Sequence, residues 1–319
     1  MKNNNQSRTK NSAYGRLTPS LAFQLAAPHT WVAALVPVMV SYVYCAITYS
    51  GKLNTLYAFI LLLICVLMQS AVNVFNDYFD YVKGTDSQDN SSDDAFDAVL
   101  VYNNINPRSA LALAIVYLAA AGLLGVYLTF QTSVTLLIIG IVGALIVVLY
   151  SGGKTPISYL PIGEAVSGIV MGGLIPLACC YALSGILAFE VLLVSVPLMI
   201  GIGLILFTNN SCDIEKDIAA KRRTIAVLLG RDRVKSAYNA ALCVWILAIV
   251  ALIGIFYSSG MPFVLMMMLC AFPAMRALVN NPLIARSRDG AMAQIVTLNV
   301  IFGTFYCLAM AAPSFVAWV

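Results

Sequence analysis

The sequence contains very little charge. Only 10% of its 319 residues are Asp, Glu, Lys or Arg, whereas 61% are hydrophobic, and the mean hydropathy is +0.88. Soluble globular domains carry about 25% charged residues, so the composition excludes that class. It predicts an all-α polytopic membrane protein whose spans are apolar helices.

Histidine and closely paired cysteines are scarce as well. The single histidine, His29, excludes a multi-histidine metal centre, and its place at the start of the first apolar run favours an interfacial role. The eight cysteines are scattered, mostly in apolar runs, without the C-x-x-C spacing of zinc or redox sites. The G-x-x-x-x-G-K-[ST], G-x-S-x-G and H-E-x-x-H motifs are absent, which excludes nucleotide hydrolysis, serine esterase and zinc protease chemistry.

Apolar runs of about twenty residues, long enough to cross a bilayer, dominate the rest of the chain. Nine are predicted as transmembrane helices, at 30–49, 54–75, 108–128, 133–151, 163–184, 187–208, 237–257, 261–280 and 292–316. No cleavage site follows a short hydrophobic core, so no cleaved signal peptide is predicted. Residues 1–20 are expected to form a disordered cytoplasmic tail and residues 21–319 one transmembrane domain. Glycines in MGGLIP (171–176), GIGL (201–204) and SGG (151–153) predict close contacts between helices.

The basic residues indicate the orientation. With nine spans and a cytoplasmic N-terminus, every Lys and Arg except Lys52 lies in or beside a cytoplasmic segment, as the positive-inside rule requires. Every acid except Glu190 lies on the same side. We therefore expect a multi-pass protein of the cell (inner or cytoplasmic) membrane with its polar chemistry on the cytoplasmic side. The net charge of +4 follows from this asymmetry, and nothing indicates nucleic-acid binding.

Two acidic stretches end spans on this side. NVFNDYFDYVKGTD (73–86) follows the second span, and TNNSCDIEKDIAAKRRT (208–224) ends the sixth. In a helix, each stretch places its polar side chains on one face: Asn73, Asn76, Asp77 and Asp80 in the first, and Asn209, Asn210, Asp213 and Asp217 in the second. Carboxylates gathered at a bilayer boundary repel one another unless a cation neutralises them.

This pattern predicts a particular chemistry. Carboxylate and carboxamide oxygens suit Mg²⁺, which also bridges to substrate phosphates. Five basic residues lie nearby in the sequence and are expected to bind the remaining diphosphate charge, although each also fits the positive-inside pattern: Lys83, Lys154, Lys221, Arg222 and Arg223. A phosphorylated head group with an apolar tail between helices describes a polyprenyl diphosphate. Its allylic C–O bond would break as diphosphate leaves, and a nucleophile would capture the carbocation in a chamber poor in water.

The paired motifs resemble those of the UbiA superfamily of intramembrane aromatic prenyltransferases. The first is N-D-x-x-D at 76–80, and the second is N-N-x-x-D-x-x-x-D at 209–217. Nine spans also fit that superfamily. Three further pieces are similar to its menaquinone branch, the 1,4-dihydroxy-2-naphthoate polyprenyltransferases: NDYFDYVKGTD (76–86), YSGGKTPISYLPIGE (150–164) and DIAAKRRTIAVLLGR (217–231).

The resemblance implies roles for individual residues. It implies that Mg²⁺ and the diphosphate are organised by Asn76, Asp77, Asp80, Asp213 and Asp217, of which the four aspartates are the catalytic candidates. Other branches of the superfamily carry a third acid at the position of Gly84 in this chain, and the resemblance implies that Asp86 takes its place. Tyr150 and Ser151 resemble a Tyr-Ser/Thr pair beside the prenyl diphosphate, with Lys154 following. The implied acceptor is an aromatic compound, with 1,4-dihydroxy-2-naphthoate in menaquinone biosynthesis as the expectation.

Three cationic positions of the menaquinone branch are missing. Its R-P-x-T element is Ala27-Pro28-His29-Thr30 here, the Arg before its second motif is Cys212, and a G-P-R element is replaced by an acidic segment. If those arginines recognise the acceptor or the diphosphate, this chain uses another acceptor or binds the same one differently.

Two other classes of membrane protein fit the sequence less well. A cation-coupled transporter would also place acids on membrane helices, but transporters hold them in broken helices near the midplane, and both motifs here lie at helix ends on one side. A phospho-alcohol transferase would need its D-x-x-D-G and G-x-x-x-D-x-x-x-D elements in a single run, which is absent.

Overall fold

The protein is a bundle of helices in the computed structural model, which describes residues 14–49, 53–84 and 99–316. These described ranges contain helices and one isolated bridge, between Gly15 and Ile105, but no strand. The longer helices are α2 (Val32–Thr48), α3 (Thr55–Lys83), α5 (Pro107–Gln131), α6 (Val134–Ser151), α8 (Ile175–Ser184), α10 (Val196–Cys212), α12 (Ile225–Phe256), α13 (Met261–Asn280) and α14 (Arg288–Val316). The short ones are α1 (Pro19–Leu25), η1 (Pro28–Thr30), α4 (Val99–Tyr102), η2 (Ile157–Tyr159), α7 (Gly163–Ile169), η3 (Val170–Leu174), α9 (Glu190–Val194), α11 (Ile214–Ala219), η4 (Ser258–Gly260) and η5 (Ala285–Ser287).

The protein crosses the membrane several times, as predicted. Seven helices of the described residues are long and apolar enough to span a bilayer, and an eighth is reached if the pair Pro19–Thr30 and Val32–Thr48, bent by 55°, is one span. The expected span at 187–208 corresponds to α9 and α10, and α10 has only 17 residues. The count of nine therefore stays a prediction, while the all-helical membrane architecture is confirmed.

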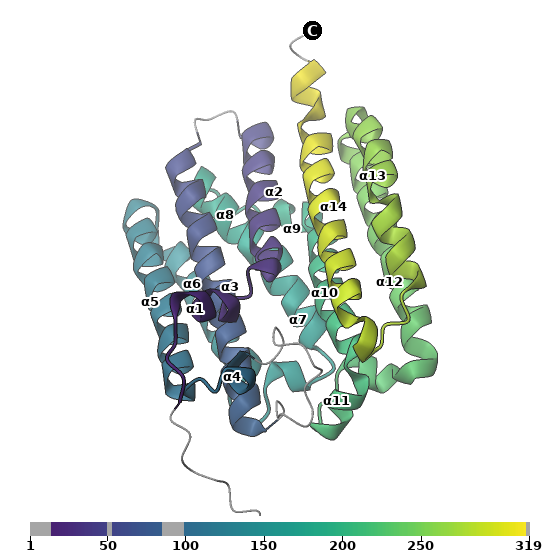
Figure 1. Cartoon of the computed structure of the whole chain (residues 1–319). Coiled ribbons are helices and arrows are strands. Elements are labelled where there is room, and N and C mark those ends of the chain that lie inside the picture. Colours follow the sequence, from purple (N-terminus) through teal and green to yellow (C-terminus); the bar gives the residue numbers. More distant parts are fainter. Residues whose placement is uncertain (1–13, 50–52, 85–98, 317–319) are drawn as a thin grey trace, which may run out of the picture.

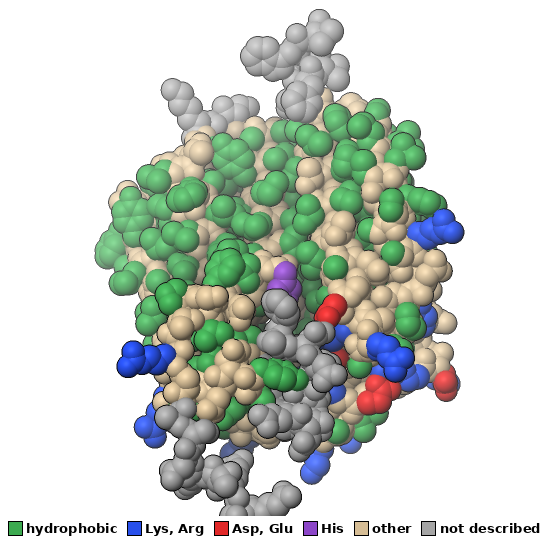
Figure 2. Space-filling view, in the orientation of Figure 1, with side chains coloured by type: hydrophobic (Ala, Val, Ile, Leu, Met, Phe, Trp, Pro, Cys, Tyr) green, Lys and Arg blue, Asp and Glu red, His purple; other side chains and the backbone are tan. Residues whose placement is uncertain are grey.

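Charged side chains gather at one end of the bundle. On the face shown in Figure 2, most Lys, Arg, Asp and Glu side chains lie in the lower half, and most of the coloured side chains of the upper half are hydrophobic. Figure 1 places α4 and α11 at this same end. The polar chemistry is thus concentrated where the second and sixth predicted spans end.

Side-chain caps define the starts of several helices. Asn54 accepts a hydrogen bond from the backbone N–H of Leu56 at the start of α3, and Asn106 caps α5, which begins with Pro107. At its other end α3 stops at Gly84, whose φ of 73° suits glycine. Because α3 has 29 residues without interruption, it carries the whole first motif on one continuous helix.

Close backbone contacts fix α7 and η3 against α10. A Cβ atom on Gly168 would lie 2.3 Å from the carbonyl oxygen of Met199, and one on Gly172 would lie 2.4 Å from the backbone nitrogen of Met199. Gly201 is packed as tightly against the ring of Trp245. The prediction of close helix contacts is confirmed at Gly172 and Gly201, whereas a Cβ atom on Gly153 would have no neighbour within 4 Å.

The expected tail, residues 1–20, is only partly described. Residues 1–13 lie outside the described ranges. From Tyr14 on the chain has defined contacts, because the Gly15 N–H donates to the Asn104 carbonyl at 2.9 Å and α1 begins at Pro19.

Candidate active site

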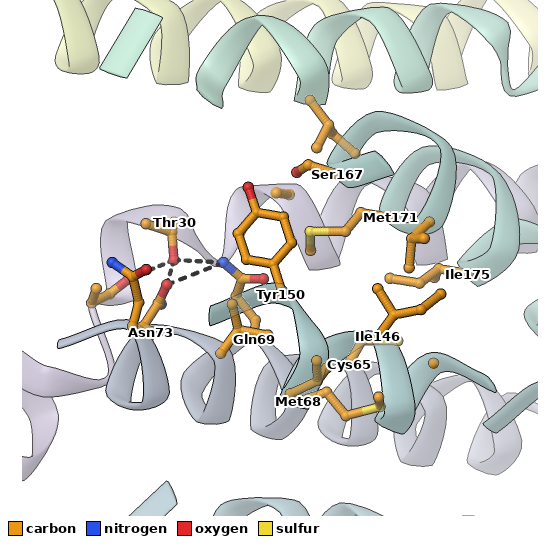
Figure 3. Close-up of a pocket in the computed structure, with 18 of the residues that line it drawn as sticks. Thr30, Cys65, Met68, Gln69, Asn73, Ile146, Tyr150, Ser167, Met171 and Ile175 are labelled. Atoms are coloured by element: carbon orange, nitrogen blue, oxygen red, sulfur yellow. Dashed lines mark hydrogen bonds between the residues drawn. The ribbon is translucent and has the colours of Figure 1, made fainter. Parts of the chain in front are cut away.

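A cavity of about 960 Å³ lies between the helices that carry the two motifs. Most of its wall is apolar and comes from α3, α5, α6, α8 and α10. Its polar end holds side chains of both motifs, among them Asn76, Asp77 and Asn209. Figure 3 shows Tyr150 between a polar group at Thr30, Gln69 and Asn73 and an apolar group that includes Met171 and Ile175. The cavity is therefore amphipathic, with its polar part toward the charged end of the bundle.

The first motif lies on the last turns of α3 and contacts the end of α6. Asn76 donates from Nδ2 to Asp80 at 3.3 Å and accepts from the Ser151 hydroxyl at 3.1 Å. Lys83 donates from Nζ to the Ser151 carbonyl at 3.0 Å. The helical spacing predicted that these α3 residues share a face, and the contacts with Ser151 bring a predicted substrate residue to that face.

The second motif spans the junction of α10 and α11. Asp213 ends α10 with φ and ψ of −104° and 20°, so the helix is interrupted there. The bonds from Asp213 N to Asn209 O (3.2 Å) and from Asp217 N to Asp213 O (2.8 Å) nevertheless keep the i to i+4 pattern. Asn209, Asp213 and Asp217 thus follow one another turn by turn, as the spacing predicted.

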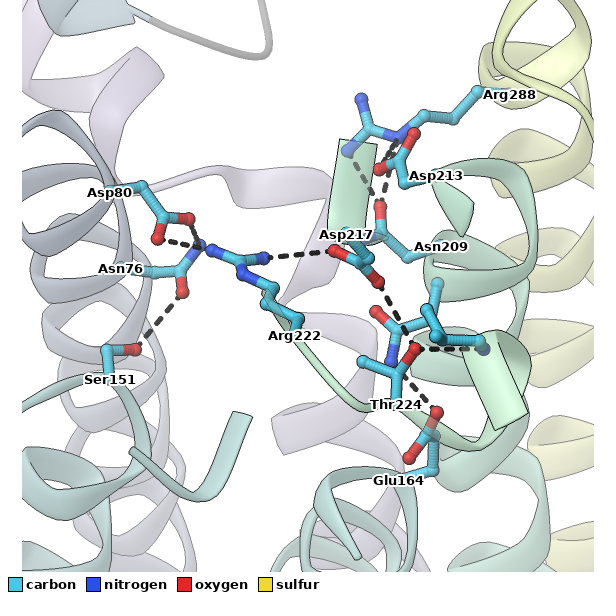
Figure 4. A network of polar contacts seen from close by, with 12 residues as sticks. Asn76, Asp80, Ser151, Glu164, Asn209, Asp213, Asp217, Arg222, Thr224 and Arg288 are labelled. Atoms are coloured by element: carbon cyan, nitrogen blue, oxygen red, sulfur yellow. Dashed lines mark hydrogen bonds and ion pairs between the residues drawn. The ribbon is translucent and has the colours of Figure 1, made fainter. Parts of the chain in front are cut away.

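Arg222 joins the two motifs (Figure 4). Its guanidinium pairs with Asp80 of the first motif through one Nη and lies 3.5 Å from Asp217 of the second through the other. Its backbone N–H also donates to the Asp217 carbonyl at 2.8 Å. A buried carboxylate needs a partner of opposite charge, and here one guanidinium serves two.

Burial determines the electrostatics of Asp217. Its side chain is 2% exposed, and burial raises the pKa of its carboxyl to about 6, with Arg222 opposing the rise and Asp213 adding to it. The Thr224 hydroxyl donates to this carboxylate at 3.2 Å. Arg222, although buried, has its pKa raised, because its interactions with Asp80 and Asp217 outweigh the effect of burial. The positive charge of Arg222 thus favours the ionised form of the buried Asp217 carboxylate.

An aromatic ring holds two of these cations in place. Tyr159 lies beneath both the Lys83 Nζ, 4.7 Å from the ring centroid, and the Arg222 Cζ, 4.8 Å from it. The Arg223 N–H donates to the Tyr159 carbonyl at 2.8 Å. Tyr159 therefore links the loop after α11 to the end of α3.

Arg288 brings a further guanidinium to the second motif from the start of α14. It donates to Asn209 Oδ1 from Nε at 3.0 Å and from Nη2 at 2.7 Å, and Nε lies 3.2 Å from Asp213 Oδ2. Arg288 also lines the cavity. The positive charge that the sequence lacks at Cys212 is thus supplied by a residue that is distant in the chain.

Asn73 belongs to a separate polar group. Its Nδ2 donates to the Ala26 carbonyl at 2.9 Å and to the Thr30 hydroxyl at 2.8 Å, and Gln69 also donates to Thr30, at 3.1 Å. Ala27 has a φ of 46°, unusual for a residue other than glycine, and the 3-10 turn that follows places His29 and Thr30 on the cavity wall. The predicted face is present, but its first residue binds the N-terminal segment.

The remaining predicted residues are distributed unevenly. Tyr150, Asn210 and Asp77 line the cavity, whereas Lys154 is exposed and the structure gives it no partner among the described residues. Asp86 lies outside the described residues. Within the ranges described, no three His, Cys, Asp or Glu side chains lie close enough together to hold a metal ion. Arg222 instead joins Asp80 to Asp217, and Arg288 pairs with Asp213.

Sequence reasoning missed Arg288, Glu164 and Tyr159. Arg288 reaches Asn209 across 79 positions, and Glu164 binds Asn210 across 46. Their signals were weak, because Arg288 fits the positive-inside pattern and Glu164 follows a loop directly before an apolar run.

The fold and site define an all-helical membrane protein with an acid-rich site over an apolar cavity. Residues 34–298 match the UbiA prenyltransferase family, so the chain belongs to that family and is a prenyltransferase. It is 34% identical to the 1,4-dihydroxy-2-naphthoate octaprenyltransferase of Bacillus subtilis over 233 residues, which cover 73% of each chain. It is 29% identical to the UbiA prenyltransferase domain-containing protein 1 of Danio rerio over 311 residues, covering 92% of this chain and 87% of that one.

The fold matches solved members of the family. A UbiA homolog from Archaeoglobus fulgidus, described as bound to DMAPP and Mg²⁺, superposes with a TM-score of 0.62 over 91% of this chain and 99% of that chain, at 13% identity. A UbiA homolog from Aeropyrum pernix K1 superposes with a TM-score of 0.59 over 93% and 100%, at 15% identity. At these identities the likeness establishes the fold. The family assignment favours an enzyme over the cation-coupled transporter.

Proposed function

We propose that this prenyltransferase moves a polyprenyl group from its diphosphate to an aromatic acceptor in a Mg²⁺-dependent reaction. The observation that carries the proposal is the convergence of both acid motifs at the polar end of an apolar cavity. The named activity of the relative from Bacillus subtilis supports it.

The donor set suits Mg²⁺. The four motif aspartates outnumber the two arginines that pair with them, and Asn76 and Asn210 of the motifs add carboxamide oxygens. Hard oxygen donors of this kind bind Mg²⁺ together with substrate phosphates. Asn76, Asp77, Asp80, Asp213 and Asp217 would hold the ion, which when bound would neutralise the charge of the leaving diphosphate.

The chain's own residues perform the other tasks. Arg222 and Lys83, held over Tyr159, are placed to bind diphosphate oxygens as charge develops on them. The apolar wall takes the tail and keeps water from the allylic carbocation. Tyr150 lines the cavity and Ser151 donates to Asn76, so both would lie near the C–O bond that breaks.

We infer that the acceptor is an aromatic carboxylate, most simply 1,4-dihydroxy-2-naphthoate in menaquinone biosynthesis. Arg288 supports this assignment, because it brings a cation to the cavity wall beside Asn209. Its Nε and Nη2 donate to Asn209 Oδ1, so an acceptor carboxylate would meet a guanidinium that the second motif already holds in place. We further propose that the N-terminus and this polar end face the cytoplasm across the cell membrane, because the positive-inside rule favours that orientation.

One assay tests the reaction class and the acceptor together. The protein, purified in detergent, is given a labelled polyprenyl diphosphate with and without Mg²⁺ and a panel of aromatic acceptors. We expect Mg²⁺-dependent diphosphate release with the dihydroxynaphthoate. Release with another aromatic acceptor alone would keep the reaction class and replace the acceptor, and no turnover by folded protein with any acceptor would refute the proposal.

A further inference from the structure

One buried carboxylate of this region has no place in the mechanism above. Glu164 lies in the first turn of α7 and is 5% exposed. Its Oε1 accepts a hydrogen bond from Asn210 Nδ2 at 2.9 Å, whereas its Oε2 is buried and has no hydrogen-bond partner among the described residues. A buried carboxylate with half of its capacity unused is costly, so a purely structural position would favour a neutral side chain.

The contact with Glu164 determines which way the Asn210 carboxamide points. A carboxylate only accepts hydrogen bonds, so it selects the NH₂ group of Asn210 and turns the carbonyl oxygen away from itself. Asn210 is 7% exposed and lines the cavity, and Glu164 lies behind it, outside the lining. The atom left for the cavity is therefore an oxygen, the donor that a hard cation requires.

The helices that carry the pair cannot easily shift against each other. The glycine contacts of α7 and η3 with Met199 hold these helices at backbone distance from α10. A Cβ atom on Gly203 of α10 would lie 3.3 Å from the carbonyl oxygen of Glu164 itself. Glu164 and Asn210 thus sit on a rigid frame, as an orienting contact requires.

We propose that Glu164 is a positioning residue, which orients Asn210 so that its amide oxygen serves the cation site at the second motif. The proposal rests on the proposed function, because it assigns a role toward the Mg²⁺ site. It predicts that cation affinity depends on Asn210 being the donor in this hydrogen bond, and not only on the presence of the bond.

Exchanging the carboxylate and the amide between positions 164 and 210 tests which side chain must donate the hydrogen bond. In E164Q the new amide accepts or donates, so Asn210 is free to turn its NH₂ to the cavity. In the double variant E164Q/N210D the glutamine donates to the aspartate, whose second oxygen faces the cavity, and net charge and volume are kept. Electron paramagnetic resonance measures the affinity for Mn²⁺ in the presence of inorganic diphosphate, so the cation site is tested without turnover.

We expect E164Q to weaken Mn²⁺ binding by about 10-fold to 100-fold, the usual effect of removing a partner of a metal ligand, and the double variant to recover most of the loss. The half-saturating Mg²⁺ concentration for diphosphate release should move in parallel. Glu190→Gln, at an exposed glutamate in the first turn of α9, is the matched control and should bind as the original chain does.

Two results would overturn the proposal. Unchanged Mn²⁺ binding in E164Q, or a swap variant no better than E164Q, would show that Glu164 does not orient a cation ligand. If E164Q does not fold, the swap variant decides alone, since it keeps the hydrogen bond. Absence of Mn²⁺ binding in the original chain would instead refute the metal site and this proposal together.

Discussion

Arg222 pairs with Asp80 although 142 positions separate them in the chain. The same guanidinium lies 3.5 Å from Asp217, so one side chain connects the end of α3 with α11. Both ends of the contact are buried, with 13% of the Arg222 side chain and 9% of the Asp80 side chain exposed. The relative position of the two acid motifs therefore depends on a residue outside both of them.

Replacing Arg222 by methionine should cost both stability and activity. The change leaves the carboxylates of Asp80 and Asp217 buried without their cation, and breaking a buried ion pair costs about 3–5 kcal/mol. Protonation of Asp217 limits the loss, because its pKa of about 6 rises further when Arg222 is gone. Thermal unfolding in detergent at pH 7 measures the effect.

Arg223→Met is the control for this change. Arg223 is the exposed neighbour, and it contacts Tyr159 only through its backbone N–H among the contacts described. We expect a melting temperature close to that of the original chain. Equal destabilisation by both variants would contradict the bridging role of Arg222.

Asp213→Asn should reduce turnover on the order of 100-fold while the protein stays folded. The substitution keeps the volume and removes one negative charge from the proposed cation site, where charge stabilisation contributes most to the rate. Arg288 keeps its two bonds to Asn209, so the start of α14 stays in place. Diphosphate release at saturating Mg²⁺ measures the loss, and Asp232→Asn at an exposed site on α12 is the control. Full activity of Asp213→Asn would rule out its metal role.

The helical spacing of the sequence was sufficient to predict each motif but not how the motifs meet. Asn76 and Asp80 share a face because α3 continues through both, a local property that periodicity reveals. The contacts of Asn76 with Ser151, and of Asn209 with Arg288, depend on packing between helices that are 75 and 79 positions apart. No single sequence fixes such distances, so Arg288 was read only as a marker of orientation.

The transmembrane spans show the same contrast between what local sequence predicts and what depends on tertiary packing. Apolar composition predicted the membrane class correctly, because it depends only on the sum of side-chain hydropathies. It did not predict the 55° bend between Pro19–Thr30 and α2, nor the positive φ of Ala27 three residues before that bend. That bend brings Thr30 to Asn73, and it follows from contacts with α3 that hydropathy does not encode.

Arg288→Gln should raise the KM for a carboxylated acceptor by about 10-fold or more. A hydrogen bond to a charged group contributes about 1.5–3 kcal/mol, and each 1.4 kcal/mol corresponds to a factor of ten. A matched acceptor without the carboxylate should show a much smaller change, as should Arg286→Gln, an exposed arginine two positions away. Equal increases in KM for both acceptors would mean that Arg288 acts only through Asp213.

Gly172→Ala should destabilise the protein, because its Cβ has no space beside α10. That atom would lie 2.4 Å from the backbone nitrogen of Met199 and 2.6 Å from its Cα, so the helices must separate. Overpacking of this kind costs about 1–3 kcal/mol. Gly254→Ala on α12 is the matched control, since its nearest neighbour would be the Met261 sulfur at 3.9 Å and alanine favours a helix. Thermal unfolding of the two variants should therefore diverge, and a Gly172→Ala protein as stable as the Gly254→Ala protein would show that η3 and α10 are not held at backbone contact.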